Sequence, residues 1–189
     1  MVRRIESGTA TIEDYQRLLL NLRQQVIEGG RWISRAASNF GNEEFRSAAI
    51  RHAVAEHRDY KLLERDYVAT GGDLADIRSA SKNIGSEALS AFMFQQASRP
   101  DPVDLLGAMF VIEGLGSRLA LGWAQRLQAQ LGLADDQTMF LRYHGEADEE
   151  HIAELTGLLN LLTPEQEATV VRTAEVVARL YALQVEEMR

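Results

Sequence analysis

The chain has 189 residues, with 20 Lys and Arg against 28 Asp and Glu, so its formal net charge is −8. An acidic chain repels nucleic acid and anionic lipid, and we expect neither nucleic acid nor a membrane as its partner. It has no cysteine, which excludes disulfides, thiolate metal sites and a cysteine nucleophile. The longest apolar run, residues 105–112, is far shorter than the roughly 20 residues needed to cross a bilayer. We expect a cytoplasmic protein with a single domain over residues 1–189.

The three prolines, at positions 100, 102 and 164, all stand where a helix would begin. No segment shows the two-residue alternation of a strand, so the pattern favours an all-helical protein. The first helix is predicted to begin at Thr11, with Asp14 closing a capping box. Gly29 and Gly30 interrupt this helix, which predicts either a kink or a closely packed neighbour.

Further along the chain, the predicted second helix covers residues 42–70, and the third covers 73–98 with a break near 83–85. The fourth begins with Asp101 as N-cap and Pro102 at the first helical position, and ends before Gly132. The fifth covers 135–162. The sixth begins with Thr163 as cap in the sequence T-P-E-Q and continues to the C-terminus. These elements predict an all-α bundle of six to seven helices.

Three side chains of the fifth predicted helix share one face. His144, Asp148 and His151 stand at positions i, i+4 and i+7, which point in directions of about 0°, 40° and −20° on an ideal helix. Two imidazoles and a carboxylate suit a divalent metal such as iron, manganese or zinc. The alternative is a solvated acidic face with two incidental histidines.

Glu113 lies within the most apolar predicted helix, in the sequence AMFVIEGLGSRLALGW. A buried carboxylate must be protonated, paired or bound to a cation, because an unpaired charge is costly in an apolar setting. The alternative to a metal ligand is an ion pair with an arginine such as Arg118.

The other two histidines lie in the sequence RHAVAEHRDY. His57 precedes an amphipathic run, and we expect it to face the core. His52 and Glu56 form an i, i+4 pair on a different side of the same helix, so both faces cannot point at one site unless the helix is distorted.

The sequence resembles the haem-oxygenase-like superfamily, and within it the iron-dependent oxidases and oxygenases. In that family a histidine precedes an H-x-x-x-D-x-x-H triad, with a helical glutamate about midway. The same order is found here in His57, Glu113, His144, Asp148 and His151. The resemblance implies that these five residues bind one or two iron ions, or manganese, with Glu113 able to bridge two metals.

One feature departs from that family. Its diiron members carry another glutamate within about two turns before the first histidine, but the corresponding face here has Ile50, Ala53 and Val54. No residue matches the missing ligand, and the sequence leaves four candidates, which are Glu56, His52, Glu64 and Glu28. One metal site is therefore expected to be weak or absent.

The resemblance implies a non-haem iron enzyme that uses O₂ to oxidise a small organic substrate. We expect the aromatic side chains of Trp32, Phe92, Phe94, Phe110 and Tyr143 to line its pocket. Haem oxygenase itself is a weaker alternative, because it needs a haem-ligating histidine on the first helix, where residues 11–36 contain none.

Two alternatives belong to other classes of protein. The first is a metal-free ligand-binding or accessory protein of the same fold, in which Glu113 pairs with an arginine. The second is a structural helical protein that forms a homodimer through its fourth and sixth helices and has no cavity near Glu113.

Overall fold

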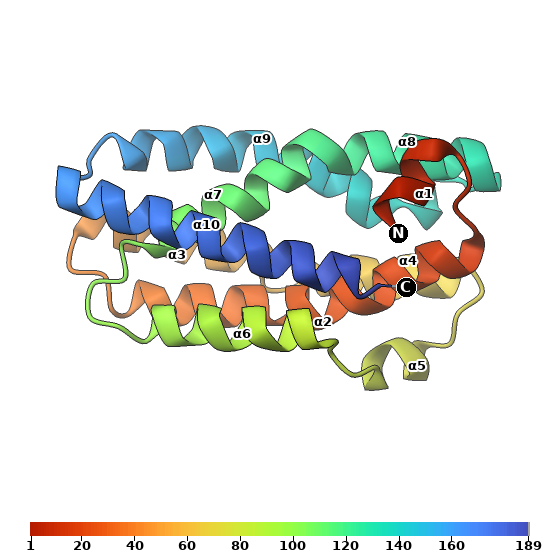
Figure 1. Cartoon of the computed structure of the whole chain (residues 1–189), viewed down its shortest axis with the longest axis horizontal. Coiled ribbons are helices and arrows are strands. Elements are labelled where there is room, and N and C mark those ends of the chain that lie inside the picture. Colours follow the sequence, from red (N-terminus) through yellow and green to blue (C-terminus); the bar gives the residue numbers. More distant parts are fainter. Residues whose placement is uncertain (189) are drawn as a thin grey trace.

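The computed structural model describes residues 1–188, apart from the side chains of Glu149 and Glu150. In this part of the chain all regular elements are helical, and the long helices lie side by side along one axis (Figure 1). The expected all-α bundle is confirmed, although several of the expected helices are divided. In chain order the elements are α1 (Val2–Ser7), α2 (Ile12–Ala37), α3 (Glu43–Glu56), α4 (Tyr60–Ala69), α5 (Leu74–Ser79), α6 (Ile84–Ala97), α7 (Leu105–Leu115), η1 (Gly116–Ala120), α8 (Leu121–Leu131), η2 (Asp135–Gln137), α9 (Met139–Leu159) and α10 (Pro164–Glu186).

Two of the predicted helix starts are confirmed by their capping bonds. The hydroxyl of Thr11 accepts the backbone N–H of Asp14, and the Asp14 carboxylate accepts the N–H of Thr11. Thr163 and Gln166 form the same reciprocal pair at the start of α10. Each pair satisfies two donors that a helix start would otherwise leave free.

Other boundaries differ from the prediction. The fourth helix begins at Leu105 instead of Pro102, because Asp101 takes a left-handed backbone (φ 47°) and its carboxylate accepts the N–H of Gly41. At the predicted break near 83–85, Asn83 caps α6 by accepting the N–H of Ser86. The short helix α1 was not predicted.

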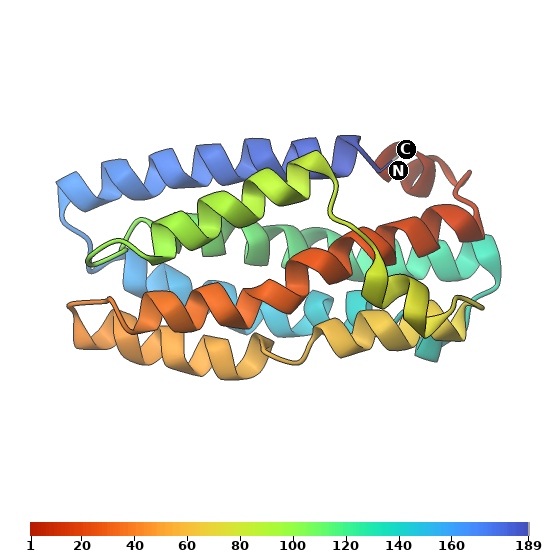
Figure 2. The same ribbon diagram turned by 90° about the horizontal axis from the view of Figure 1, so that it is seen from below.

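The predicted second helix is divided by a turn over residues 57–59, and Figure 2 shows α3 and α4 end to end alongside α2. Gly30 explains how closely α2 approaches this turn. A Cβ at Gly30 would lie 2.8 Å from the Cα of His57, so the glycine permits close packing. The helix α2 continues through Gly29 and Gly30 without a break.

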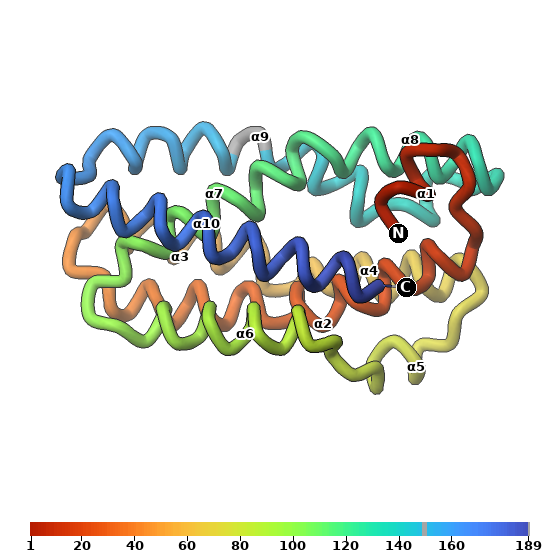
Figure 3. The backbone as a smooth tube through the Cα atoms, viewed as in Figure 1, coloured from red at the N-terminus to blue at the C-terminus, as the bar shows by residue number. Residues whose placement is uncertain are grey.

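The buried apolar side chains form two separate clusters, one around α2, α3, α6 and α7 and the other around α1, α2, α4 and α8. The backbone tube in Figure 3 shows the helical run α7–η1–α8 passing along the bundle beside α9. This run, Leu105–Leu131, is long and apolar enough to cross a membrane by length and composition. Core helices meet the same criterion, and here the run packs against α9 and α10.

Candidate metal centre

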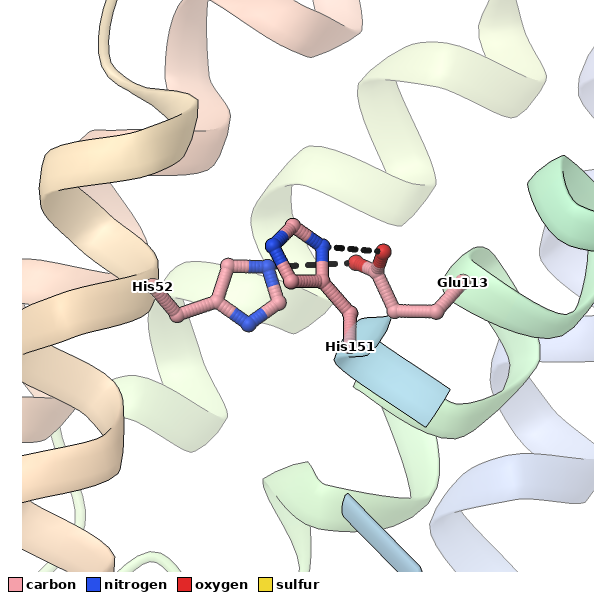
Figure 4. Close-up of side chains that lie close together, drawn as sticks. All are labelled: His52, Glu113 and His151. Carbon is pink, nitrogen blue, oxygen red and sulfur yellow. Dashed lines mark hydrogen bonds and ion pairs between the residues drawn. The ribbon is translucent and has the colours of Figure 1, made fainter. Parts of the chain in front are cut away.

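Three side chains from three different helices meet in the interior (Figure 4). Glu113 of α7 accepts a hydrogen bond from His151 Nδ1 of α9 at 3.1 Å, and its other oxygen lies 3.2 Å from His52 Nε2 of α3. The two imidazole rings are stacked, with their centroids 4.6 Å apart. Ligand atoms of all three residues lie within 4.8 Å of one another, as the donors of one metal ion would.

A second group of three donors lies beside the first. Glu56, at the end of α3, Asp59, in the turn before α4, and His144, on α9, also place ligand atoms within 4.8 Å of one another. His144 Nε2 is 3.4 Å from Asp59 Oδ2, and yet these two atoms and Glu56 Oε1 are buried without a hydrogen-bond partner. Buried polar atoms are rarely left unsatisfied, and a cation between these three would satisfy them all.

Asp148 joins the two groups. Its Oδ1 is 3.0 Å from His144 Nδ1 and 3.9 Å from His151 Nδ1. The local backbone makes room for its carboxylate, because η1 is a π-helical segment that begins at Gly116, and a Cβ there would lie 1.7 Å from Asp148 Oδ2. Single π-helical turns within α-helices are frequent at functional sites.

The electrostatics of the centre are those of a buried excess of carboxylates. Burial raises the pKa of Glu56 to about 7, and the negative charges of Glu113 and Asp59 act in the same direction. Burial also raises the pKa of Asp148. For Glu113 burial is outweighed by hydrogen bonds from His151 and His52, which lower its pKa to about 2.

Two of the histidines, His144 and His151, also have raised pKa values. Burial lowers the pKa of His144, but the hydrogen bond to Asp148 and the nearby Asp59 outweigh burial and raise the pKa to about 10. The hydrogen bond to Glu113 raises the pKa of His151. Positive charge is therefore favoured throughout the centre, as protons on the histidines or as metal ions.

Of the five residues predicted from the sequence, the structure brings four together: Glu113, His144, Asp148 and His151. His57 is the exception, and the expectation that it faces the core is wrong. It is exposed, and its Nδ1 contacts the backbone oxygen of Val54 in its own helix. The face that it shares with Ile50 and Val54 is turned to solvent, where those two side chains are 52% and 67% exposed.

The opposite side of the same segment carries the residues that the sequence analysis did not place. His52, Glu56 and Asp59 stand at i, i+4 and i+7, the same spacing as His144, Asp148 and His151. His144, Asp148 and His151 project from one side of α9. His52 and Glu56 share one side of α3, and the turn that follows α3 carries Asp59 to the same site. This repeated spacing is the signal that would have identified them.

The other candidates for an additional ligand have different partners. Glu64 is held by Arg23 and Arg78, and Glu28 by Lys82 and Ser90. Arg118, the alternative partner considered for Glu113, is exposed.

The centre opens onto a cavity of about 340 Å³ that is lined mainly by apolar side chains of α2, α7, η1 and α10. Glu56, Glu113, His144 and Asp148 form part of its wall. The expectation about its aromatic lining is wrong, because Trp123, Phe140 and Tyr181 line it instead of the predicted residues. Phe110 and Tyr143 are exposed, and Trp32, Phe92 and Phe94 belong to an apolar cluster.

Residues 26–182 match the model of a protein family described as iron-containing redox enzyme. The chain belongs to this family. The resemblance to haem-oxygenase-like proteins is thereby confirmed, and the N and O donors of the centre fit the iron of the family's description. No curated protein matches the chain significantly in sequence.

Solved structures show the same fold for this member of the iron-containing redox enzyme family. A domain of unknown function with a haem oxygenase-like fold from Shewanella denitrificans has a TM-score of 0.88 at 20% identity, over 99% of this chain and 82% of that one. A TenA homolog from Pseudomonas syringae has a TM-score of 0.80 at 14% identity, over 98% and 82% of the two chains. A TenA family transcription regulator from a Silicibacter species has a TM-score of 0.70 at 16% identity, over 97% and 86%.

Proposed function

We propose that this chain is a non-haem iron enzyme that uses O₂ to oxidise a small organic substrate, and that it holds two iron ions. One ion would be held by His52, Glu113 and His151. The other would be held by Glu56, Asp59 and His144. Asp148, whose carboxylate approaches histidines of both groups, would serve both. In this proposal His52, Glu56 and Asp59 replace His57 of the sequence-based ligand set.

The observation that carries the proposal is the pair of adjacent buried three-donor groups, one of which has three polar atoms without partners. Four carboxylates, three buried and one (Glu56) partly buried, face three imidazoles. Burying that much negative charge is costly unless cations balance it. Two divalent ions would bring four carboxylates and three neutral histidines to a net charge of zero. Imidazole and carboxylate donors suit iron and also allow manganese.

Each part of the centre has a distinct task in this proposal. When bound, iron supplies the redox chemistry toward O₂, and the protein supplies geometry and a water-poor site. The three-residue groups leave positions open for O₂ and substrate. The apolar cavity beside Glu56 and Asp148 excludes water and positions the substrate at the centre.

The alternatives considered from the sequence receive less support. A metal-free binding protein was expected to pair Glu113 with an arginine, whereas its neighbours are His52 and His151. A purely structural protein was expected to have no cavity near Glu113, and one is present. The first long helix, α2, contains no histidine that could ligate haem iron.

The decisive experiment is metal content after purification from iron-containing medium. We expect about two iron ions per chain in the wild type, and anomalous scattering at the iron edge should assign both. His52→Ala should lose at least about half of the iron. His57→Ala is a matched control, because it removes an exposed histidine five residues away in the same segment.

Iron below about 0.2 per chain in the wild type would refute the proposal. So would iron that remains unchanged in a His144→Ala/His151→Ala variant. Equal losses in His52→Ala and His57→Ala would refute the assignment of His52.

A further inference from the structure

The residues that line the cavity extend along the helical run from Glu113 to Trp123, and four of them belong to the metal centre: Glu56, Glu113, His144 and Asp148. Glu113 lies on α7, and Trp123, on α8, also lines the cavity. These two residues are ten positions apart on one helical run, which corresponds to at most about 15 Å at 1.5 Å per residue, because the π-helical segment between them rises less per residue. A volume of about 340 Å³ spread over that length describes a channel that suits a chain better than a fused ring system.

The end of the channel far from Glu113 contains an unused hydrogen-bond donor. The indole Nε1–H of Trp123 is buried and has no partner. Tryptophan in an apolar setting normally finds an acceptor for this group. A bound molecule with an oxygen at this position would supply the acceptor.

The charges along the channel restrict what that molecule can be. No lysine or arginine is found among the described residues that line it. An anionic group at the Trp123 end would be desolvated without a counter-charge, which is strongly unfavourable. The carboxylates at the other end oppose an anion there too unless cations are bound.

We infer that the cavity binds an elongated, mainly aliphatic molecule that carries an uncharged oxygen, and that this oxygen accepts the hydrogen bond of Trp123. At the ~30 Å³ that a water molecule occupies in the liquid, the cavity takes roughly ten or more non-hydrogen atoms. This inference rests on the proposed function only in identifying the molecule with the substrate. The end of the bound molecule that lies opposite Trp123 is then at the metal centre.

The test uses 1-decanol and undecane, which have equal numbers of non-hydrogen atoms and differ in one oxygen. Each is added to saturation to the full-length protein without O₂, both as purified and after metal removal with EDTA. We expect both compounds to raise the melting temperature, and 1-decanol to raise it more. Trp123→Phe keeps an aromatic ring and removes the donor, so it should reduce the 1-decanol shift to that of undecane.

Two further measurements complete the test. Ala182→Phe places a ring in the wall of the channel, and it should remove both shifts while leaving the iron content unchanged. Decanoate at pH 8, tested on the metal-free protein, should give a smaller shift than 1-decanol, because no cationic side chain lines the channel.

The outcomes separate this inference from the proposed function. The absence of any shift with 1-decanol would overturn the inference, and so would an unchanged 1-decanol shift in Trp123→Phe or a larger shift with decanoate. If iron binds and 1-decanol does not, only the substrate class fails. If the metal-free protein binds 1-decanol as expected and never takes up iron, the channel assignment stands and the proposed oxidase function fails.

Discussion

The carboxylate of Asp148 lies directly against the backbone of Gly116, where a Cβ would be only 1.7 Å from its Oδ2. The side chain of Asp148 is short, and its other carboxylate oxygen, Oδ1, also contacts His144 Nδ1 at 3.0 Å. Gly116 is therefore a requirement of the centre, and its position at the start of the π-helical segment places it next to Asp148. A residue with any side chain there must displace the carboxylate that joins the two donor groups.

We therefore expect Gly116→Ala to lower the iron content to about one ion per chain or less, with the helical circular dichroism retained. Gly122→Ala is a matched control on the same helical run, because nothing lies within 4 Å of its added Cβ. The control should keep its iron and gain about 0.5–1 kcal/mol in unfolding free energy. Full iron content in Gly116→Ala would show that Asp148 is not needed for metal binding.

Fe(II) should stabilise the protein through Glu113. At a free concentration of about 100 times Kd, a ligand that binds only the folded state adds about 2.7 kcal/mol. For a chain of this length that corresponds to a rise in melting temperature of roughly 5–10 °C, measurable by anaerobic calorimetry. Glu113→Gln keeps the shape and removes the charge, so the shift should largely disappear.

Glu87→Gln serves as the control, because Glu87 is an exposed glutamate on α6. It should show the full Fe(II) shift. Equal shifts in the two variants would mean that Glu113 is not a ligand.

A separate prediction concerns Glu64, whose carboxylate is paired with Arg23 and Arg78. Burial raises its pKa, but the hydrogen bonds from Arg78 and Arg23 outweigh burial and hold the pKa below the ordinary value of 4.5. A carboxylate with a lowered folded-state pKa stabilises the fold above the unfolded pKa, and this stabilisation is lost as the pH falls through the folded-state pKa. Glu64→Gln should cost about 3 kcal/mol at pH 7, because Arg23 is left buried without its partner.

The difference in unfolding free energy between wild type and Glu64→Gln, measured by urea denaturation, should shrink when the pH is lowered below about 4. Glu175→Gln is the control, since its pair with Arg172 is exposed and should contribute less than about 1 kcal/mol. A Glu64→Gln difference that is the same at both pH values would contradict the ion-pair explanation.

The local parts of the fold could be predicted because they depend on neighbours in the chain. Thr11 and Thr163 cap their helices through residues three positions away. His144, Asp148 and His151 share a helix face whatever surrounds them. The start of α7 could not be predicted in this way, because the Asp101 carboxylate accepts the backbone N–H of Gly41, which lies sixty residues earlier in the chain.

The sequence by itself determined an all-helical chain and two sets of side chains spaced to project from a helix face. Only the tertiary structure decided which face of the segment around residues 52–59 turns inward. Helical periodicity allowed either His52 or His57 to face inward, and the amphipathic run after His57 led us to expect the wrong face to be buried. The packing of α3 against α2 and α9, with Glu113 of α7 only 3.2 Å from His52, decided for His52, because burial depends on neighbours that are distant in the sequence.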